Sequence, residues 1–365
     1  FDARLHVRME SYSSLFAELK RSNIYVKRRL RRGPIDAATR EAMCAKLMAL
    51  HKSLGNQPLY QAVVLVNKAR FEHAMDQPLV EAAAYVEAGK TFLEHEQLKL
   101  MRAEPTLDEH LHMAVVTFQM AVQVYKSQGM EADAARVCIH MANALRDLSC
   151  NDAALEWYID ALDLYTADLR KAEHNAVPAA EDGGLRPQYF AIIDALDQAA
   201  DVCVLLSDLE LLIQLLQQQL ALCMQCEAPA ILSGVFLKGS LSLVFALLVQ
   251  KMHSQAQAAL QALQLCLEPG TDVPEGVPDL PEAALAGPDR QSLVHSMPIC
   301  EWLQMECEQE ADVTCIEALC HQLLPEVSHA GDRLGQLLLY VIKAYKFPLY
   351  VEMPLLPKVT PDPKI

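Results

Sequence analysis

The sequence of 365 residues predicts an all-α protein. Apolar residues recur at steps of three or four along nearly the whole chain. No segment shows the strict apolar-polar alternation between hairpin turns that predicts a β-strand. Since 52% of the residues are hydrophobic and only 13 are glycine, the chain can bury a large core. One segment at the helical period, closed by Gly129 where a C-terminal cap belongs, contains Leu111, Val115, Phe118, Val122 and Tyr125.

Helices are predicted one after another along the chain, about fourteen in all, with short connections such as KSQGMEAD and DLSCNDAA that favour antiparallel neighbours. The run from Ile231 to Val249 is the most apolar stretch, but Lys238, two glycines and three serines interrupt it. We interpret it as a buried helix rather than a membrane span. The predicted ranges are 8–30, 35–54, 58–75, 78–101, 107–128, 131–148, 151–170, 187–206, 208–226, 229–250, 254–267, 290–308, 311–324 and 331–346.

An irregular internal repeat links several of these helices. In tetratricopeptide repeats a small residue lets two helices approach, an aromatic residue four positions on fills the groove, and a second small residue follows three later. Two copies of this pattern in the sequence are complete. A third copy, at Tyr85 and Ala88, is partial because Glu81 occupies the first small position. The pattern favours a tetratricopeptide-like helical solenoid over an unrelated bundle whose alanines merely face inward. Six residues are predicted to pack the repeats: Ala114, Phe118, Ala121, Ala154, Tyr158 and Ala161.

Composition divides the chain into four parts. Residues 1–267 are predicted to form the tetratricopeptide-like array, with a linker near 171–187. Residues 268–290 contain five prolines, three glycines and six acids, which predicts an acidic, mobile loop. Residues 291–346 are predicted as C-terminal helices, and residues 347–365 as an extended apolar tail.

No enzyme motif stands out in the sequence. It has no GxxxxGK[ST] or GxGxxG phosphate loop, no GxSxG elbow and no HExxH. His110 and His112 would point about 200° apart on a helix, so they cannot share a metal, and we interpret them as solvated surface residues. We therefore expect no catalytic, metal or cofactor site.

The cysteines leave one alternative open. Eleven cysteines, an odd number scattered among helical residues, favour buried thiols in a reducing compartment. Cys223 and Cys226 have the spacing of half a zinc site. The other cysteine-rich group has spacings that match no zinc knuckle or ribbon, and consists of Cys300, Cys307, Cys315, Cys320 and His321.

Charge is distributed unevenly along the chain. The formal net charge is -16, yet the range from Lys20 to Arg32 holds seven basic residues and no acid. Nucleic-acid binding needs a broad basic surface, so the acidic net charge of the chain argues against a nucleic-acid partner. The basic stretch is instead interpreted as a nuclear localisation signal, a solvated helix end or a dock for an acidic partner. The residues predicted to bind a partner are Lys27, Arg28, Arg29, Arg31 and Arg32, together with Tyr345, Phe347 and Tyr350 of the apolar C-terminal cluster.

The order of several segments resembles the family of the 40-kDa huntingtin-associated protein, also called the factor VIII intron 22 protein. The segments are VKRRLRRGPIDAA, YQAVVLVNKARFEHAM, EAAAYVEAGKTFLEHEQ, ALRDLSCNDAALEWY and ALDQAADVCVLLSDLELL, with a looser likeness at IEALCHQLLPEV and GQLLLYVIKA. The chain has only QCEAPAILSG where that family has a long proline- and alanine-rich loop.

The resemblance implies a non-enzymatic, all-helical scaffold that docks between the HEAT-repeat lobes of huntingtin and stabilises their arrangement. It also implies a role at early endosomes as an effector of the small GTPase Rab5, in the cytoplasm with some nuclear presence. No catalytic residue comes with it, and from charge and composition we expect no cofactor, nucleic-acid partner or membrane insertion. Two other functions are considered: a SNAP-like vesicle-fusion adaptor that binds SNARE bundles, and an enzyme or metal protein built on the cysteines.

Overall fold

A computed structural model describes residues 58–103, 108–175, 187–225, 229–267, 288–309, 313–328 and 332–346, together with the isolated positions Ala42 and Ala49. Within these ranges the secondary structure comprises twelve α-helices and no strand. The prediction of an all-α protein is therefore confirmed. The predicted helices at 8–30 and 35–54 lie outside the described ranges, as do the basic stretch and most of the acidic loop.

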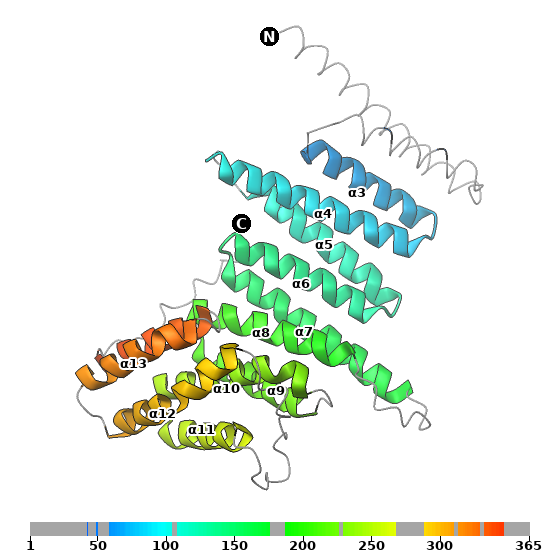
Figure 1. Cartoon of the computed structure of the whole chain (residues 1–365). Helices are drawn as coiled ribbons and strands as arrows, with labels where there is room; N and C mark the ends of the chain where they lie inside the picture. The colour runs from blue at the N-terminus through cyan, green and yellow to red at the C-terminus, as the bar shows by residue number, and fades with distance from the viewer. Residues whose placement is uncertain are drawn as a thin grey trace, which may run out of the picture. The chain divides into compact units, whose positions relative to one another are not determined.

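The chain divides into two compact units, Phe1–Asn175 and Ala176–Ile365. In the first unit, each described helix packs against the next one in sequence, so that they form a stack of antiparallel helices (Figure 1). These helices are α3 (Pro58–Ala74), α4 (Pro78–Met101), α5 (Glu109–Ser127), α6 (Glu131–Asp147) and α7 (Asn151–Asn175).

Local sequence explains where these helices begin and end. α3 and α4 both begin at a proline, which suits the first helical position because its missing N–H has no intrahelical partner there. Left-handed residues end several helices: Gly129, with φ 71°, follows α5, and Asp76 and Ser149 take the same conformation after α3 and α6. The chain can therefore reverse direction within a few residues.

Small and aromatic side chains pack the first unit. The six residues predicted to pack the repeats all have 0% exposure. Phe118 lies against Gly89 of α4, where a β-carbon would come within 2.7 Å of the ring. Tyr158 donates a hydrogen bond to Asn143 Oδ1 on α6, so its ring is buried while its hydroxyl has a partner.

α7 is longer than predicted. It runs on to Asn175, into the stretch expected to be a linker. Lys171 forms an ion pair with Glu131 at the start of α6, which holds these last turns against the neighbouring helix. α8 then begins at Pro187, where the predicted linker ends.

Seven described helices form the second unit. Most of α10 is buried, including every residue from Leu241 to Val249, which confirms the prediction of a buried helix there. No helix in the described ranges is long and apolar enough to cross a membrane. The helices are α8 (Pro187–Leu206), α9 (Leu209–Gln225), α10 (Pro229–Val249), α11 (His253–Leu267), α12 (Pro288–Glu308), α13 (Val313–Ser328) and α14 (Asp332–Lys346).

The second unit joins helices from both sides of the acidic stretch. α14 packs against α10 and α8, and α12 packs against α11 and α10. The unit boundary at Asn175 thus differs from the division at residues 268–290 that composition suggests. Side-chain contacts between α8 and α14, described below, account for this association.

Candidate functional site

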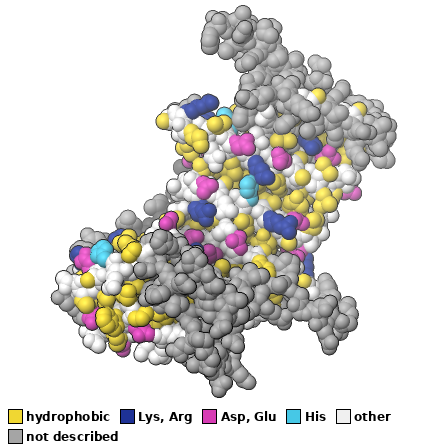
Figure 2. All heavy atoms as spheres, viewed as in Figure 1, with side chains coloured by type: hydrophobic (Ala, Val, Ile, Leu, Met, Phe, Trp, Pro, Cys, Tyr) yellow, Lys and Arg dark blue, Asp and Glu magenta, His cyan; other side chains and the backbone are white. Residues whose placement is uncertain are grey.

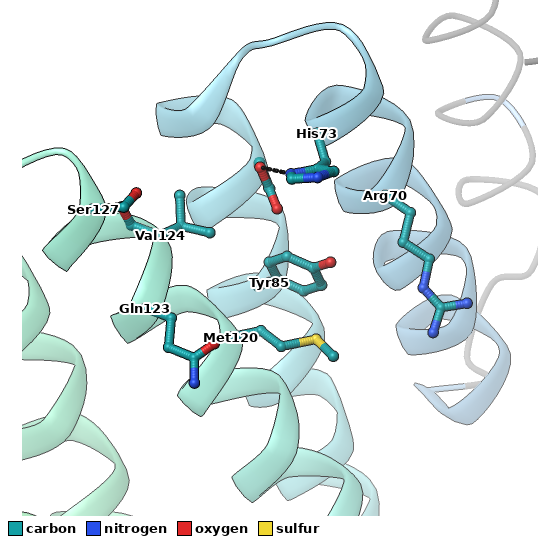
Figure 3. A pocket seen from close by; sticks show the side chains of 8 residues that line it. Arg70, His73, Tyr85, Met120, Gln123, Val124 and Ser127 are labelled. Atoms are coloured by element: carbon teal, nitrogen blue, oxygen red, sulfur yellow. Dashed lines mark hydrogen bonds and ion pairs between the residues drawn. The ribbon is translucent and has the colours of Figure 1, made fainter. Parts of the chain in front are cut away.

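A pocket of about 310 Å³ opens between α3, α4 and α5 of the first unit (Figure 3). α3 contributes polar side chains from its last turns, α4 contributes buried residues of its first two turns, and α5 contributes a wall that is partly apolar. Its lining residues are Arg70, His73, Glu81, Tyr85, Met120, Gln123, Val124 and Ser127.

One carboxylate of the pocket is buried and paired. Glu81 lies in the first turn of α4, where the helix dipole favours a negative charge, and its side chain is 8% exposed. His73 of α3 donates from Nδ1 to Glu81 Oε2 over 3.0 Å. Figure 3 shows this contact at one end of the pocket. The histidine therefore satisfies the carboxylate, which would otherwise be costly to bury.

Two possible donors also line the pocket. Tyr85 is buried in α4, and Figure 3 shows its hydroxyl directed toward the side on which Arg70 lies. Burial raises the pKa of Tyr85, and the Glu81 carboxylate raises it further, while Arg70 opposes both. The phenol is therefore protonated at neutral pH and can donate. Among the described residues, neither Tyr85 nor Arg70 makes a hydrogen bond or ion pair.

The second unit contains a charged cluster that joins its helices. Arg333 of α14 is fully buried and bonds Asp197 Oδ1 at 2.7 Å and Asp201 Oδ1 at 2.6 Å, both on α8. Lys238 of α10 lies 3.0 Å from Asp197 Oδ2. Burial opposes ionisation of Asp197, but Arg333 and Lys238 outweigh it and hold the pKa of that carboxyl below its ordinary value. The negative charges of the two aspartates balance the positive charges of Arg333 and Lys238. We therefore interpret this cluster as structural, because it holds the helices together.

The eight cysteines whose side chains the structure describes are not in disulfides. Cys300 and Cys307 of α12 and Cys320 of α13 are buried. Burial, together with the neighbouring thiols of Cys307 and Cys300, raises the pKa of Cys320 to about 12. Within the described ranges, no three His, Cys, Asp or Glu side chains are placed to hold a metal ion. Cys226, half of the predicted CMQC pair, lies outside those ranges.

The two histidines interpreted as solvated differ from each other. His112 is exposed, but His110 is buried, so that interpretation was wrong for His110. The cause is the close packing of α5 on α4, which brings the rings of His110 and His95 to a centroid distance of 4.5 Å.

Of the residues predicted to bind a partner, the structure describes only Tyr345. It lies in α14, is 9% exposed, and donates to the Leu248 carbonyl over 3.3 Å. Tyr345 thus packs inside the second unit, and its role in binding stays a prediction. The remaining predicted residues lie outside the described ranges: Lys27, Arg28, Arg29, Arg31, Arg32, Phe347 and Tyr350.

Sequence reasoning did not find the pocket, although one signal was present. Glu81 breaks the small-aromatic-small pattern of the partial repeat, and a residue that violates a structural pattern often marks a functional or strained position. Lys238, inside the most apolar stretch, was the matching signal for the charged cluster. No known family model matches the chain, and no curated protein is significantly similar to it. The packing of the first unit and the sequence pattern therefore carry the functional proposal.

Proposed function

We propose that the chain is a non-enzymatic binding scaffold with a tetratricopeptide-like helical solenoid. The observation that carries this proposal is the complete burial of both small-aromatic-small sets, centred on Phe118 and Tyr158, between stacked helices of the first unit. In solenoids such residues let neighbouring repeats approach, and the stack then presents an extended surface to a partner. The sequence predicts about fourteen helices for this solenoid, two of them at positions outside the described ranges.

The proposed partner is huntingtin, a large HEAT-repeat protein. This part of the proposal rests on the resemblance of the sequence segments to the 40-kDa huntingtin-associated protein family. The scaffold docks between the HEAT-repeat lobes and stabilises their arrangement. It acts at early endosomes as a Rab5 effector through that complex, in the cytoplasm with some nuclear presence, and it uses no cofactor, nucleic acid or membrane insertion.

Large apolar side chains at the surface support a binding role. Met101 at the end of α4 is 82% exposed, and Trp302 of α12 is 63% exposed. Tryptophan and methionine are enriched in protein interfaces, because binding removes their apolar surface from water. Figure 2 shows apolar side chains interspersed with acidic and basic ones over the visible described surface, a mixed composition that protein partners share.

Co-expression with full-length huntingtin, followed by size-exclusion chromatography, tests the proposal. We expect the two chains to elute together, and we expect the chain to unfold at a higher temperature in the complex than alone, because a partner that binds only the folded state stabilises it. Separate elution, with an unchanged unfolding temperature when the two proteins are mixed, would contradict the proposal.

A SNAP-like adaptor that binds SNARE bundles is the alternative, since that family also stacks irregular helical repeats. A pull-down with an assembled SNARE bundle separates the two functions. Capture by the SNARE bundle without capture by huntingtin would favour the adaptor.

A further inference from the structure

The outer face of α12, in the second unit, exposes an apolar strip. Trp302 is 63% exposed, and Met305, one turn further on, is 44% exposed. Pro298 and Gln309 are exposed on the same face. The opposite face, which includes Cys307, is buried, and α12 packs against α10, α11 and α13. Large apolar side chains that lie next to one another at the surface mark a binding site more often than scattered ones do.

The strip has the spacing of a seam between two helices. Its positions follow one another at steps of four, three and four residues, which is the a and d pattern of a coiled coil. Pro298 and Met305 are then d positions, and Trp302 and Gln309 are a positions. In such a seam each side chain inserts between four side chains of the facing helix. The spacing therefore favours a helix as the partner of this face.

Acidic residues border the strip on both sides. Glu301 and Glu308 occupy the g positions, and Glu306 occupies one of the two e positions. Glu308 accepts a hydrogen bond from Gln304 of its own helix. The side chains of Glu301 and Glu306 form no ion pair or hydrogen bond with another described residue. The charges at e and g set which helix can pair in a coiled coil, so these glutamates favour a helix that carries lysine or arginine there.

The same charges argue against a second copy of this chain as the partner. If two of these strips met, the glutamates of one would face the glutamates of the other in the parallel and in the antiparallel orientation, and like charges across an interface destabilise it. The neighbouring helices α11 and α13 contain no lysine or arginine that could neutralise them. The basic groups must therefore come from a different protein.

We propose that the outer face of α12 binds a basic amphipathic helix of a partner protein, with aliphatic residues along its seam and lysine or arginine beside them. Trp302 and Met305 insert between the aliphatic side chains of that helix. Glu301 and Glu306 pair with its basic side chains. The inference rests on the proposed role of the chain as a binding scaffold, but it holds whether or not huntingtin is the protein that supplies the helix.

The test uses the full chain and two dye-labelled peptides of four heptads, each with leucine at every a and d position. The lysine peptide has lysine at every e and g position, and the glutamate peptide has glutamate there. The fluorescence anisotropy of the dye measures binding. We expect saturable binding of the lysine peptide, and binding of the glutamate peptide that is weaker by at least about tenfold, because its charges repel those of α12.

Tryptophan emission shows where the lysine peptide binds. The chain has two tryptophans, and Trp157 of α7, in the first unit, is only 8% exposed. The peptides contain no tryptophan, and indole emission moves to shorter wavelength when the ring leaves water. Unlabelled lysine peptide should therefore shift the emission of the protein by burying Trp302. The shift should saturate together with the anisotropy, and Trp302→Phe should abolish it.

A variant of the strip tests its apolar contact. Met305→Gln should weaken binding of the lysine peptide by about tenfold, because it removes an apolar side chain from the seam. Leu339→Gln is the matched control: Leu339 of α14 is 43% exposed, nearly as much as Met305 at 44%, but it lies on another helix. This control should leave binding unchanged.

The charges are tested by neutralising two acids together. Glu301→Gln combined with Glu306→Gln should weaken binding by about fivefold, because each exposed ion pair contributes only modestly. Glu156→Gln combined with Glu210→Gln removes the same total charge from exposed positions on α7 and α9, and should leave binding unchanged. Circular dichroism of each variant shows that the helices are still folded.

Several results would overturn the proposal. Equal binding of the two peptides would show that the glutamates of α12 contribute nothing. Equal losses in the two double variants would indicate general attraction between the acidic chain and a basic peptide. An unchanged tryptophan emission during binding would place the peptide elsewhere on the chain. If huntingtin fails to co-elute and the lysine peptide still binds α12, only the huntingtin proposal fails, and the converse result removes only this one.

Discussion

Arg333 and Asp197 are 136 residues apart in sequence, and Arg333 Nη2 bonds both the Oδ1 atom of Asp197, at 2.7 Å, and its main-chain carbonyl, at 2.6 Å. A single guanidinium nitrogen thus links α14 to the middle of α8 through two hydrogen bonds. The planar, always charged guanidinium suits such a buried contact better than an ammonium group does. This pair joins the two ends of the second unit.

Replacement of Arg333 by methionine should destabilise the protein strongly. The change leaves Asp197 without its main partner, and breaking a buried ion pair costs about 3–5 kcal/mol. We expect the lower end of that range, about 3 kcal/mol, because the Asp197 side chain is 23% exposed and water can reach it. Urea unfolding followed by circular dichroism measures the loss.

The matched control is Arg136→Met. That arginine also forms a 2.7 Å ion pair with an aspartate, but its side chain is 71% exposed. Its loss should cost less than about 0.5 kcal/mol, because water screens exposed pairs. Similar losses in the two variants would contradict a structural role for the Arg333 cluster.

Asp194, one turn before Asp197 on α8, should make stability depend on pH in the opposite sense to Asp197. Partial burial raises the pKa of Asp194, and the nearby Asp197 charge raises it further, against the hydrogen bond from Gln198. A raised folded pKa means that stability is full below the unfolded value and is lost as the pH rises through the folded value. Asp194→Asn should therefore raise the unfolding midpoint at pH 7 and leave it nearly unchanged at pH 3.

Asp197→Asn supplies the contrast. The lowered pKa of Asp197 gives stability that is present above its ordinary value of 3.8 and is lost as the pH falls through the lower folded value. The asparagine variant should therefore be less stable at pH 7 and approach the parent protein in acid. Parallel pH profiles for the two variants, measured by thermal unfolding, would show that these directions are wrong.

Gly89→Ala should destabilise the first unit although alanine favours helices. The added β-carbon would lie 2.7 Å from the fully buried ring of Phe118, closer than real contacts allow, so the ring or the backbone would have to shift. Overpacking of this kind costs about 1–3 kcal/mol, against a gain of about 1 kcal/mol in helix propensity. Thermal unfolding should show a net loss, and Phe118→Leu in the same chain should recover part of it.

Gly234→Ala is the control for helix propensity. Gly234 lies in α10 with no atom within 4 Å of the added β-carbon, so the change should stabilise the protein by up to about 1 kcal/mol. Equal effects at the two glycines would show that the contact with Phe118 does not limit position 89.

The helices could be predicted from sequence because their period, prolines and reversing turns are local signals. The ends of α3, α4 and α14 agree with the predicted ranges to within a residue or two. The pocket and the charged cluster could not be predicted in the same way. Arg333 and Asp197 meet only because α14 folds back on α8, and no periodic pattern within either helix encodes that contact.

Tyr345 is a residue for which composition suggested a surface position and the structure shows a buried one. Its position beside a proline-broken, apolar segment suggested a surface cluster, whereas the helical period of α14 places it on the face that packs against α10. The composition of a segment predicts its general character. The position of a residue in the helical period decides whether its side chain is buried.

The buried thiols should be inert in the native protein. Burial raises the pKa values of Cys138, Cys203, Cys307 and Cys320 to about 12, and only the thiolate attacks an alkylating reagent. With iodoacetamide at pH 8, mass spectrometry should find the exposed Cys315 modified first among the eight cysteines whose side chains the structure describes. The four buried thiols should react only after urea unfolds the chain. Their modification at the rate of Cys315 in native buffer would contradict this packing.

The basic stretch gives the last prediction, which concerns residues outside the described ranges. Reversal of Arg28, Arg29, Arg31 and Arg32 to glutamate should weaken binding to huntingtin, if that stretch docks on an acidic partner surface. Because exposed charges attract less strongly as salt screens them, the difference between the parent and the variant should shrink as the ionic strength rises. Binding measured at several salt concentrations checks both points. Replacement of the same four residues by lysine keeps the charge and should retain most of the affinity. Unchanged binding together with a lost nuclear fraction in cells would instead assign the stretch to nuclear import.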